Sequence, residues 1–268
     1  MQIKAGDIAA LIRTLSRTAG KKHFTSAVIA AAGSGTRMGG EKTKQLTELC
    51  GVPVIVRTLM AFERCPEIDE IIVAARSDET ALYAEFREKY QISKLKEVVA
   101  GGETRQESVL KGFERISDKS EFVAIHDGAR CLVTPEIISS VAKEAFNWGA
   151  ATAASRVCDT VKRADFKGFV SETVDRSTLW LAGTPQIFKT ELYRAAAYVA
   201  KEEGFAATDD NMLAEHIGYP VRLVDCGSDN IKITTPADLA VAEVILRRIG
   251  DVFQTEKDAE NARAGHIS

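Results

Sequence analysis

The chain has few cysteines, little net charge and no long apolar run. Its five cysteines are odd in number and include no C-x-x-C pair, which argues against a disulfide framework or a zinc site and is typical of a reducing cytoplasm. No apolar stretch approaches the about 18 residues of a membrane-spanning helix. The net charge of −3 argues against broad binding to nucleic acid or to a membrane surface, because such binding requires a basic face. We therefore expect a cytoplasmic protein without nucleic-acid or membrane partners.

The composition is otherwise that of an ordinary globular protein. With 268 residues, 45% of them hydrophobic and 27% charged, the chain is long enough for a substantial core. Strand-like segments alternate with helix-like segments, and the connections between them are short. The predicted strands, after a first one that contains Val28 and Ile29, are 70–75, 97–100, 122–125, 150–155 and 221–224. The predicted helices are 54–64, 78–90, 104–116, 192–203 and the two opened by Thr134-Pro135 and Thr235-Pro236. This alternation predicts an α/β fold with a mainly parallel sheet covered on both faces.

The two ends of the chain differ from the body at 26–250. Residues 1–25 carry apolar side chains at helical spacing, and their basic residues outnumber a single acid, Asp7. This pattern favours an amphipathic helical extension that packs on the body or on a partner, with an organellar transit peptide as the alternative. Residues 251–268 are polar and aperiodic, which predicts a flexible tail. Within the body we also expect Thr104 to cap a helix, and Thr208 to cap a short helix that Gly218 ends.

The most informative segment is 27–45, which reads AVIAAAGSGTRMGGEKTKQ. A buried strand leads into Gly33 and Gly35, whose missing side chains let the backbone turn and let an anion approach the N–H groups. Three cations follow within nine residues, namely Arg37, Lys42 and Lys44. Bare backbone donors followed by cations suit a polyphosphate. Met38 stands where a dinucleotide fingerprint has its third glycine, and a P-loop motif is absent, so both of those classes are disfavoured. A glycine-rich turn without a ligand is the alternative.

Other polar loops are expected at the same edge of the sheet. In an open parallel sheet the ligand lies beyond the carboxyl ends of the strands. The loops predicted there contain Gly101-Gly102 followed by Ser108, the sequence HDGAR at 126–130, and NIKIT at 230–234. Asp127 is a candidate Mg²⁺ ligand, because Mg²⁺ takes one or two carboxylates together with phosphate oxygens. Taken singly, Asp127 and Arg130 could form a structural salt bridge, and Lys232 could be a solvated lysine.

One segment breaks the alternation of strands and helices. Residues 156–176 are polar and prone to β structure, with a turn expected at 165–168. The segment has too little apolar surface to form a core layer, so it predicts a projecting hairpin that packs against a partner. We therefore expect a homodimer held by this arm.

These residues together resemble the 2-C-methyl-D-erythritol 4-phosphate cytidylyltransferase family of the non-mevalonate isoprenoid pathway. The resemblance covers roughly residues 27 to 246, and its blocks follow the order of the family. The matching blocks are AAGSGTRM at 31–38, KQ at 44–45, GGETRQESV at 101–109, HDGAR at 126–130, DTVK at 159–162, TVDRSTLW at 173–180, TPQIF at 184–188, TDD at 208–210 and NIKIT at 230–234. The family implies a Rossmann-like three-layer sandwich of the nucleotidyltransferase, glycosyltransferase-A-like type. It also implies a protruding β-arm exchanged in a homodimer, and Mg²⁺-dependent chemistry.

The resemblance assigns roles by position. The residues that match those holding CTP are Ala31, Ala32, Gly33, Gly35, Gly102 and Ser108. Arg37 and Lys44 match the pair that stabilises the transition state, and Asp127 and Arg130 match the acid and arginine of the HDxAR block. The residues that match those placing the acceptor phosphate are Thr160, Arg176, Thr184 and Lys232, with the arm reaching the neighbouring subunit. Two usual prolines are replaced, one by Thr43 before the Lys-Gln pair and one by Cys131 after Arg130, which puts the stiffness of both loops in question.

The chemistry implied by the family agrees with the residue types present. A phosphate oxygen of the acceptor attacks the α-phosphorus of CTP and pyrophosphate leaves, which needs positioned positive charge and no general base. His126, the histidine near the expected site, is interpreted as structural. Two alternatives stay open. One is a ribitol 5-phosphate cytidylyltransferase, against which Leu179-Trp180 before TPQ is a weak argument, and the other is a non-enzymatic nucleotide sensor on the same fold.

Overall fold

The computed structural model describes residues 22–33 and 43–250 of the chain. The tail expected at 251–268 and all but the last four residues of the extension expected at 1–25 lie outside the described residues. Over the part that is described, no helix is long and apolar enough to cross a membrane.

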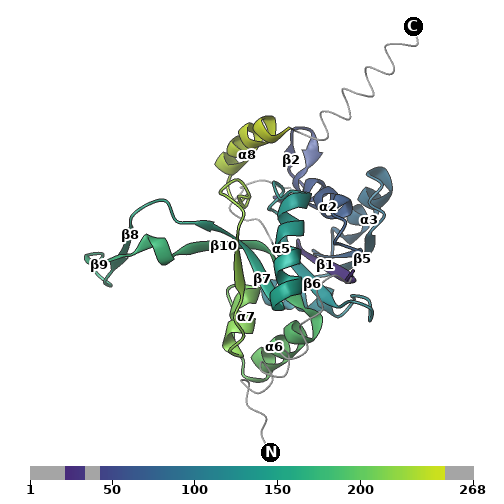
Figure 1. Ribbon diagram of the computed structural model, residues 1–268. Coiled ribbons are helices and arrows are strands. Elements are labelled where there is room, and N and C mark those ends of the chain that lie inside the picture. Colours follow the sequence, from purple (N-terminus) through teal and green to yellow (C-terminus); the bar gives the residue numbers. More distant parts are fainter. Residues whose placement is uncertain (1–21, 34–42, 251–268) are drawn as a thin grey trace, which may run out of the picture.

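A sheet runs through the centre of the molecule (Figure 1). It has seven strands in the order β11-β7-β10-β6-β1-β4-β5. Its strands are β1 (Thr25–Ala30), β4 (Glu70–Ala75), β5 (Leu95–Ala100), β6 (Phe122–Asp127), β7 (Ala150–Arg156), β10 (Trp180–Lys189) and β11 (Arg222–Asp225). Pairing is parallel from β6 through β1 and β4 to β5, and between β7 and β11. Only β10 among these seven strands runs antiparallel to its neighbours, β6 and β7. The expected mainly parallel sheet is confirmed, and β10 is a strand that the sequence analysis missed.

Helices cover both faces of the sheet, which confirms the three-layer α/β sandwich. One apolar core contains Ala27 and Ile29 of β1 together with side chains of α2 (Val54–Arg64), α3 (Thr80–Lys89) and α5 (Pro135–Trp148). A second core contains Val28 together with side chains of α4 (Arg105–Phe113), α6 (Thr190–Glu202) and α7 (Asp210–His216). The side chains of β1 alternate between two buried faces, which explains its uninterrupted apolar run.

Two smaller units lie beside this sandwich. The hairpin of β2 (Glu48–Leu49) and β3 (Val52–Pro53) precedes α2. Helix α8 (Pro236–Ile249) forms a third apolar cluster with Leu49 and with residues that follow β6, among them Cys131 and Leu132. The loop after β6 is therefore held from outside by the last helix.

Three predicted helix caps are confirmed and one is wrong. The Thr104 side chain accepts a hydrogen bond from the Glu107 N–H, and Thr134 caps α5 in the same way. Helix α8 begins at Thr235-Pro236, as expected. Helix α7, however, is capped by Asp209, whose carboxylate accepts from the Met212 N–H at 3.1 Å. Thr208 lies one residue too early for this role, and its hydroxyl contacts the Met212 sulfur instead.

The segment at 156–176 forms the expected arm. Strands β8 (Val161–Ala164) and β9 (Val170–Val174) pair antiparallel and project far from the sandwich (Figure 1). The turn is where it was expected, since the Asp165 carboxylate accepts from the backbone N–H of Phe169 and Gly168 adopts a φ of +86°. Phe166 and Phe169 near the tip are 95% and 70% exposed. The arm returns through a 3₁₀ turn, η2 (Arg176–Thr178), into β10.

Candidate functional site

A cavity of about 330 Å³ opens beyond the carboxyl ends of β1, β5 and β6, and we call it the strand-end pocket. It brings together residues that are far apart in the sequence. Among the predicted site residues, those that line it are Ala32, Gly33, Lys44, Gly102, Ser108, Asp127 and Lys232. Ala31 is fully buried directly before this group, while Gly35 and Arg37 lie outside the described residues. The expectation that these loops converge is confirmed for the described residues.

Two loops pack so closely at this pocket that side chains would not fit. A Cβ on Gly101 would lie 2.4 Å from the Ala32 Cβ, and one on Gly102 would lie 2.4 Å from the Glu107 Cβ. Ser108 ties the second loop to its helix, because its hydroxyl accepts from the Gly102 N–H at 3.0 Å and donates to the Thr104 carbonyl at 2.8 Å. Gly101 and Gly102 therefore let this loop pack closely on Ala32 and on α4 at the pocket wall.

Asp127, the last residue of β6, lies at the centre of a cluster of cations. Its Oδ1 accepts from Arg105 Nε at 3.1 Å. Its Oδ2 contacts Lys232 Nζ at 2.9 Å and accepts from Arg130 Nε at 3.3 Å. Burial raises the pKa of this carboxyl, but the neighbouring positive charges outweigh burial and hold it well below its usual range. Asp127 is therefore a carboxylate at neutral pH.

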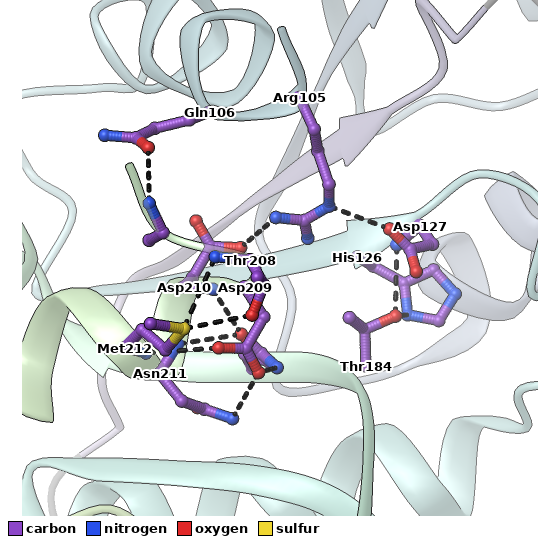
Figure 2. A network of polar contacts seen from close by, with 12 residues as sticks. Arg105, Gln106, His126, Asp127, Thr184, Thr208, Asp209, Asp210, Asn211 and Met212 are labelled. Atoms are coloured by element: carbon purple, nitrogen blue, oxygen red, sulfur yellow. Dashed lines mark hydrogen bonds and ion pairs between the residues drawn. The ribbon is translucent and has the colours of Figure 1, made fainter. Parts of the chain in front are cut away.

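Arg105 joins Asp127 to a second, deeper carboxylate (Figure 2). The Arg105 Nη1 donates to Asp210 Oδ2 at 2.7 Å, and the hydroxyl of Tyr193 donates to Asp210 Oδ1 at 3.0 Å. Burial raises the pKa of Asp210 even though the Arg105 guanidinium favours the anion. The sequence analysis assigned no role to Arg105 or Asp210. Both lie inside quoted blocks, GGETRQESV and TDD, which is the signal that could have identified them.

His126 and Thr184 fix the end of β6 through hydrogen bonds that do not involve the Asp127 carboxylate. Burial lowers the pKa of His126 to about 3, so its ring is neutral at pH 7 and carries one proton. The contacts assign that proton to Nε2, which faces the Arg130 carbonyl at 3.2 Å, while Nδ1 accepts from the Thr184 hydroxyl at 3.0 Å. The Thr184 oxygen in turn accepts from the Asp127 N–H at 3.1 Å. The single hydroxyl proton of Thr184 is thus engaged inside the protein, and His126 is structural.

A second cavity of about 430 Å³ lies next to the first, and we call it the side pocket. Lys232 lines both cavities, so it stands at their boundary. Arg130 lines the side pocket and is fixed by donating from Nη1 to the Asn230 carbonyl at 2.8 Å. The Asn230 side chain donates to the Thr184 carbonyl, also at 2.8 Å. Two cations are therefore presented to a space directly beside the strand-end pocket.

The two arm residues are not part of this arrangement. Neither Thr160 nor Arg176 is among the described residues that line the two pockets. The Arg176 guanidinium is exposed and donates to the Cys158 carbonyl at the base of the arm. Within one described chain, these two residues stay separate from the cations around Asp127.

The residues that replace the usual prolines are both buried. Cys131 lies in the apolar cluster beneath α8, where burial raises the pKa of its thiol to about 12. Thr43 is also buried, immediately before the pocket residues Lys44 and Gln45. Cys131 is therefore a packing position, whereas Thr43 adds a buried polar side chain to its loop.

The described residues do not form a metal site by themselves. In the ranges 22–33 and 43–250, no group of three or more histidine, cysteine or acidic side chains is arranged to hold a metal ion. Asp127 is the acidic group at the centre of the pocket, and both of its oxygens are shared with cationic side chains. A Mg²⁺ ion here fits only if phosphate oxygens supply most of its ligands.

Comparison with known proteins gives a consistent result. The family model described as IspD, 2-C-methyl-D-erythritol 4-phosphate cytidylyltransferase, matches residues 25–248. A protein of that name from Caldanaerobacter subterraneus is 46% identical over 83% of this chain and 99% of its own length. One from Syntrophus aciditrophicus is 42% identical over 83% of this chain and 95% of its own length.

Solved structures agree with the sequence relatives. The crystal structure of a 4-diphosphocytidyl-2C-methyl-D-erythritol synthase from Anaerococcus prevotii superposes with a TM-score of 0.75 and 32% identity, over 85% of this chain and all of that one. A 2-C-methyl-D-erythritol 4-phosphate cytidylyltransferase from Thermus thermophilus gives a TM-score of 0.69 and 31% identity, over 84% of this chain and 99% of its own.

Proposed function

Since the chain belongs to the 2-C-methyl-D-erythritol 4-phosphate cytidylyltransferase family, we propose that it transfers CMP from CTP to 2-C-methyl-D-erythritol 4-phosphate. The products are 4-diphosphocytidyl-2-C-methyl-D-erythritol and pyrophosphate, as a step of non-mevalonate isoprenoid precursor synthesis. One observation carries the proposal: the strand-end pocket adjoins a second cavity, and Lys232 lies on the wall of both.

The strand-end pocket is the site of the nucleotide. Gly102 and Ser108 line its wall at the start of α4, and the resemblance assigns the same two residues to CTP. Lys44 brings a cation to the same wall. The resemblance adds Arg37 as a second cation for the charge that develops on the triphosphate, and it adds the preference for cytosine.

The side pocket is the site of the acceptor. Arg130 and Lys232 present positive charge to it, which suits a phosphate monoester. One oxygen of that phosphate, already anionic at neutral pH, forms the new bond to the α-phosphorus. The bond from that phosphorus to the bridging oxygen breaks and its electron pair leaves with pyrophosphate. The protein's part is to align the two phosphates and to stabilise the charge that accumulates between them.

We further propose that Mg²⁺ is required and enters with the nucleotide. When bound, the ion would neutralise charge on the triphosphate. Asp127 would hold it, in competition with the cations already on that group, and Glu103 is a second acidic residue on the same pocket wall. Activity in Mg²⁺, its loss on chelation and its return on adding Mg²⁺ would support this requirement.

The active unit proposed here is a cytoplasmic homodimer. The exposed Phe166 and Phe169 at the tip of the arm have no core of their own, and a second copy of the chain would cover them. In that dimer Thr160 and Arg176 would reach the acceptor site of the neighbouring subunit. The five cysteines are all free, which agrees with a reducing compartment.

A direct assay tests the assignment. Purified protein is mixed with CTP, Mg²⁺ and either 2-C-methyl-D-erythritol 4-phosphate or ribitol 5-phosphate, and pyrophosphate release and the cytidylylated product are measured. We expect turnover with the methylerythritol substrate and CTP to exceed turnover with ribitol 5-phosphate, and also turnover with ATP, GTP or UTP. Faster reaction with ribitol 5-phosphate would reassign the acceptor, and CTP binding without turnover would indicate a sensor.

A further inference from the structure

Arg105 is placed so that one side chain touches two carboxylates from different parts of the fold. It is the first residue of α4, and its guanidinium lies between Asp127 at the end of β6 and Asp210 at the start of α7 (Figure 2). Different nitrogens make the two contacts, Nε to Asp127 and Nη1 to Asp210. The planar fork of an arginine fixes the angle between two such partners, which a lysine ammonium does not.

Asp210 is held rigidly on its own side. Its carboxylate is fully buried, and it accepts from the Tyr193 hydroxyl as well as from Arg105. Its backbone N–H donates to the side-chain oxygen of Gln186 at 2.9 Å. A buried anion of this kind needs its cation, because removing one partner leaves an uncompensated charge. Arg105 is therefore anchored from behind, on the side away from the pocket.

The two carboxylate oxygens of Asp127 contact different cationic side chains. Oδ1 receives Arg105 alone among the contacts described, while Oδ2 receives the Lys232 and Arg130 side chains. An aspartate side chain can rotate about two bonds, so a fixed donor on Oδ1 determines where Oδ2 points. Lys232 and Arg130 are the cations proposed to meet the acceptor phosphate.

From this geometry we infer that Arg105, anchored by Asp210, is a positioning residue for Asp127. It sets the plane of that carboxylate and thereby places Lys232 at the boundary of the two pockets and Arg130 on the wall of the side pocket. Arg105 also lines the strand-end pocket, whereas Asp210 does not, so the change at Asp210 separates the alignment of the two substrates from the binding of CTP. The inference rests on the proposed function only for its kinetic readout.

Three variants test it at saturating CTP and acceptor. Asp210→Asn keeps the shape of the side chain and removes the anchoring charge, Arg105→Lys keeps the charge and removes the fork, and Tyr193→Phe removes one hydrogen bond. The matched control is Glu70→Gln, which also turns a buried, paired carboxylate into an amide. Glu70 is the first residue of β4, at the end of the strand away from the pocket, and its Oε2 lies 3.2 Å from Lys96 Nζ.

We expect Asp210→Asn and Arg105→Lys each to lower kcat by about tenfold to a hundredfold, the range seen when groups that orient a reactive ligand are removed. The Kd of Asp210→Asn for CTP, measured by calorimetry, changes less than about threefold, and Tyr193→Phe loses less than fivefold in kcat. Glu70→Gln lowers Tm without a comparable loss in kcat. If kcat of both variants stays within twofold of the parent, or if the loss follows the Kd for CTP, the positioning role is wrong.

A crystal structure of Asp210→Asn separates this inference from the proposed function. We expect the Asp127 carboxylate to rotate and the contact between its Oδ2 and the Lys232 Nζ to lengthen beyond 4 Å. An unchanged cluster overturns the inference whether or not the parent protein turns over. Failure of the parent protein in the assay, together with a rotated Asp127, would instead count against the proposed acceptor or reaction and leave the positioning role supported.

Discussion

The cluster around Asp127 and the arm use the same kinds of charged residue in opposite surroundings. In the cluster, Asp127 is almost completely buried and contacts three cationic side chains. On the arm, Arg163 donates to Glu172 at 2.8 Å, but these side chains are 66% and 56% exposed. Water screens the second pair, so it contributes at most about 1 kcal/mol, whereas breaking a buried pair leaves a charge that nothing solvates.

This difference indicates which region is organised for chemistry within one chain. The cations of the cluster are fixed in place by their carboxylates and by backbone carbonyls before any ligand arrives. Preorganised charge of this kind stabilises a transition state without further rearrangement. The arm instead ends in exposed aromatic side chains, and its arginine at 176 contacts a nearby carbonyl. Its contribution therefore depends on a partner, which is why the dimer is part of the proposal.

The largest effect is expected from removing a cation at the nucleotide. Lys44→Ala and Arg37→Ala should each lower turnover by at least about a hundredfold, because the loss of one preorganised charge at a developing anion has about that effect. Lys201→Ala, an exposed lysine of α6, serves as the control and should keep the parental turnover. Near-parental kcat for Lys44→Ala or Arg37→Ala at saturating CTP would show that the role assigned to that residue is wrong.

The next prediction sharpens the contrast between the cluster and the arm. If Arg176 acts across the dimer and Lys232 acts within its own chain, a heterodimer of an Arg176→Ala chain and a Lys232→Ala chain has one intact site of two. We therefore expect the purified heterodimer to recover about half of the parental activity, while each homodimer stays impaired. Differently tagged chains and tandem purification provide the heterodimer. No recovery would contradict the exchanged arm without contradicting the enzyme assignment.

A smaller effect concerns the pH dependence of the free energy of unfolding, to which the buried His126 beside the cluster contributes. His126 is buried in its neutral form, with a pKa of about 3, whereas the unfolded chain takes up a proton at its ordinary value of about 6.5. The stabilisation is therefore complete above pH 6.5 and is lost progressively as the pH falls toward 3. Between pH 7 and pH 5 this amounts to about 2 kcal/mol.

The measurement compares the parent with His126→Gln by urea unfolding at both pH values. The parent should lose about 2 kcal/mol more free energy of unfolding than the variant over this interval. Equal losses in the parent and in His126→Gln would show that His126 titrates in the folded protein.

Much of the fold could be predicted because many of its helices and strands have a hydrophobic pattern that is visible in the local sequence. Helix α2 and strand β4 were predicted with the bounds found in the structure, since α2 is a strongly amphipathic segment and β4 is a short continuous apolar run. Strand β10 was not, because Gly183 and Pro185 interrupt it, its register shifts after Ala182 and its first residues are exposed. Its pairing between β6 and β7 is tertiary and leaves little periodic signal.

Part of the candidate site could likewise be predicted from the sequence, and part could not. The topological rule for parallel sheets was enough to bring Gly33, Gly102, Asp127 and Lys232 to one edge. It could not find Asp210, because the contact with Arg105 joins residues more than a hundred positions apart through the orientation of two helices. The arm residues Thr160 and Arg176 fall outside this rule, and their expected reach to the neighbouring subunit came from the polar hairpin and from the resemblance.

The smallest expected effect concerns the exposed ion pair on the arm. Glu172→Gln removes the exposed ion pair with Arg163 while leaving the backbone pairing of β8 and β9 in place. Because this pair is solvated, we expect the free energy of unfolding to change by less than about 1 kcal/mol and kcat to be unchanged. Urea unfolding in low and in high salt measures this, and the small difference should vanish in high salt as screening increases. A larger loss of unfolding free energy that persists in high salt and depends on protein concentration would mean that Glu172 is buried against the partner subunit. The charged residues of the arm would then be fixed by contacts across the dimer, as those of the cluster are fixed within one chain.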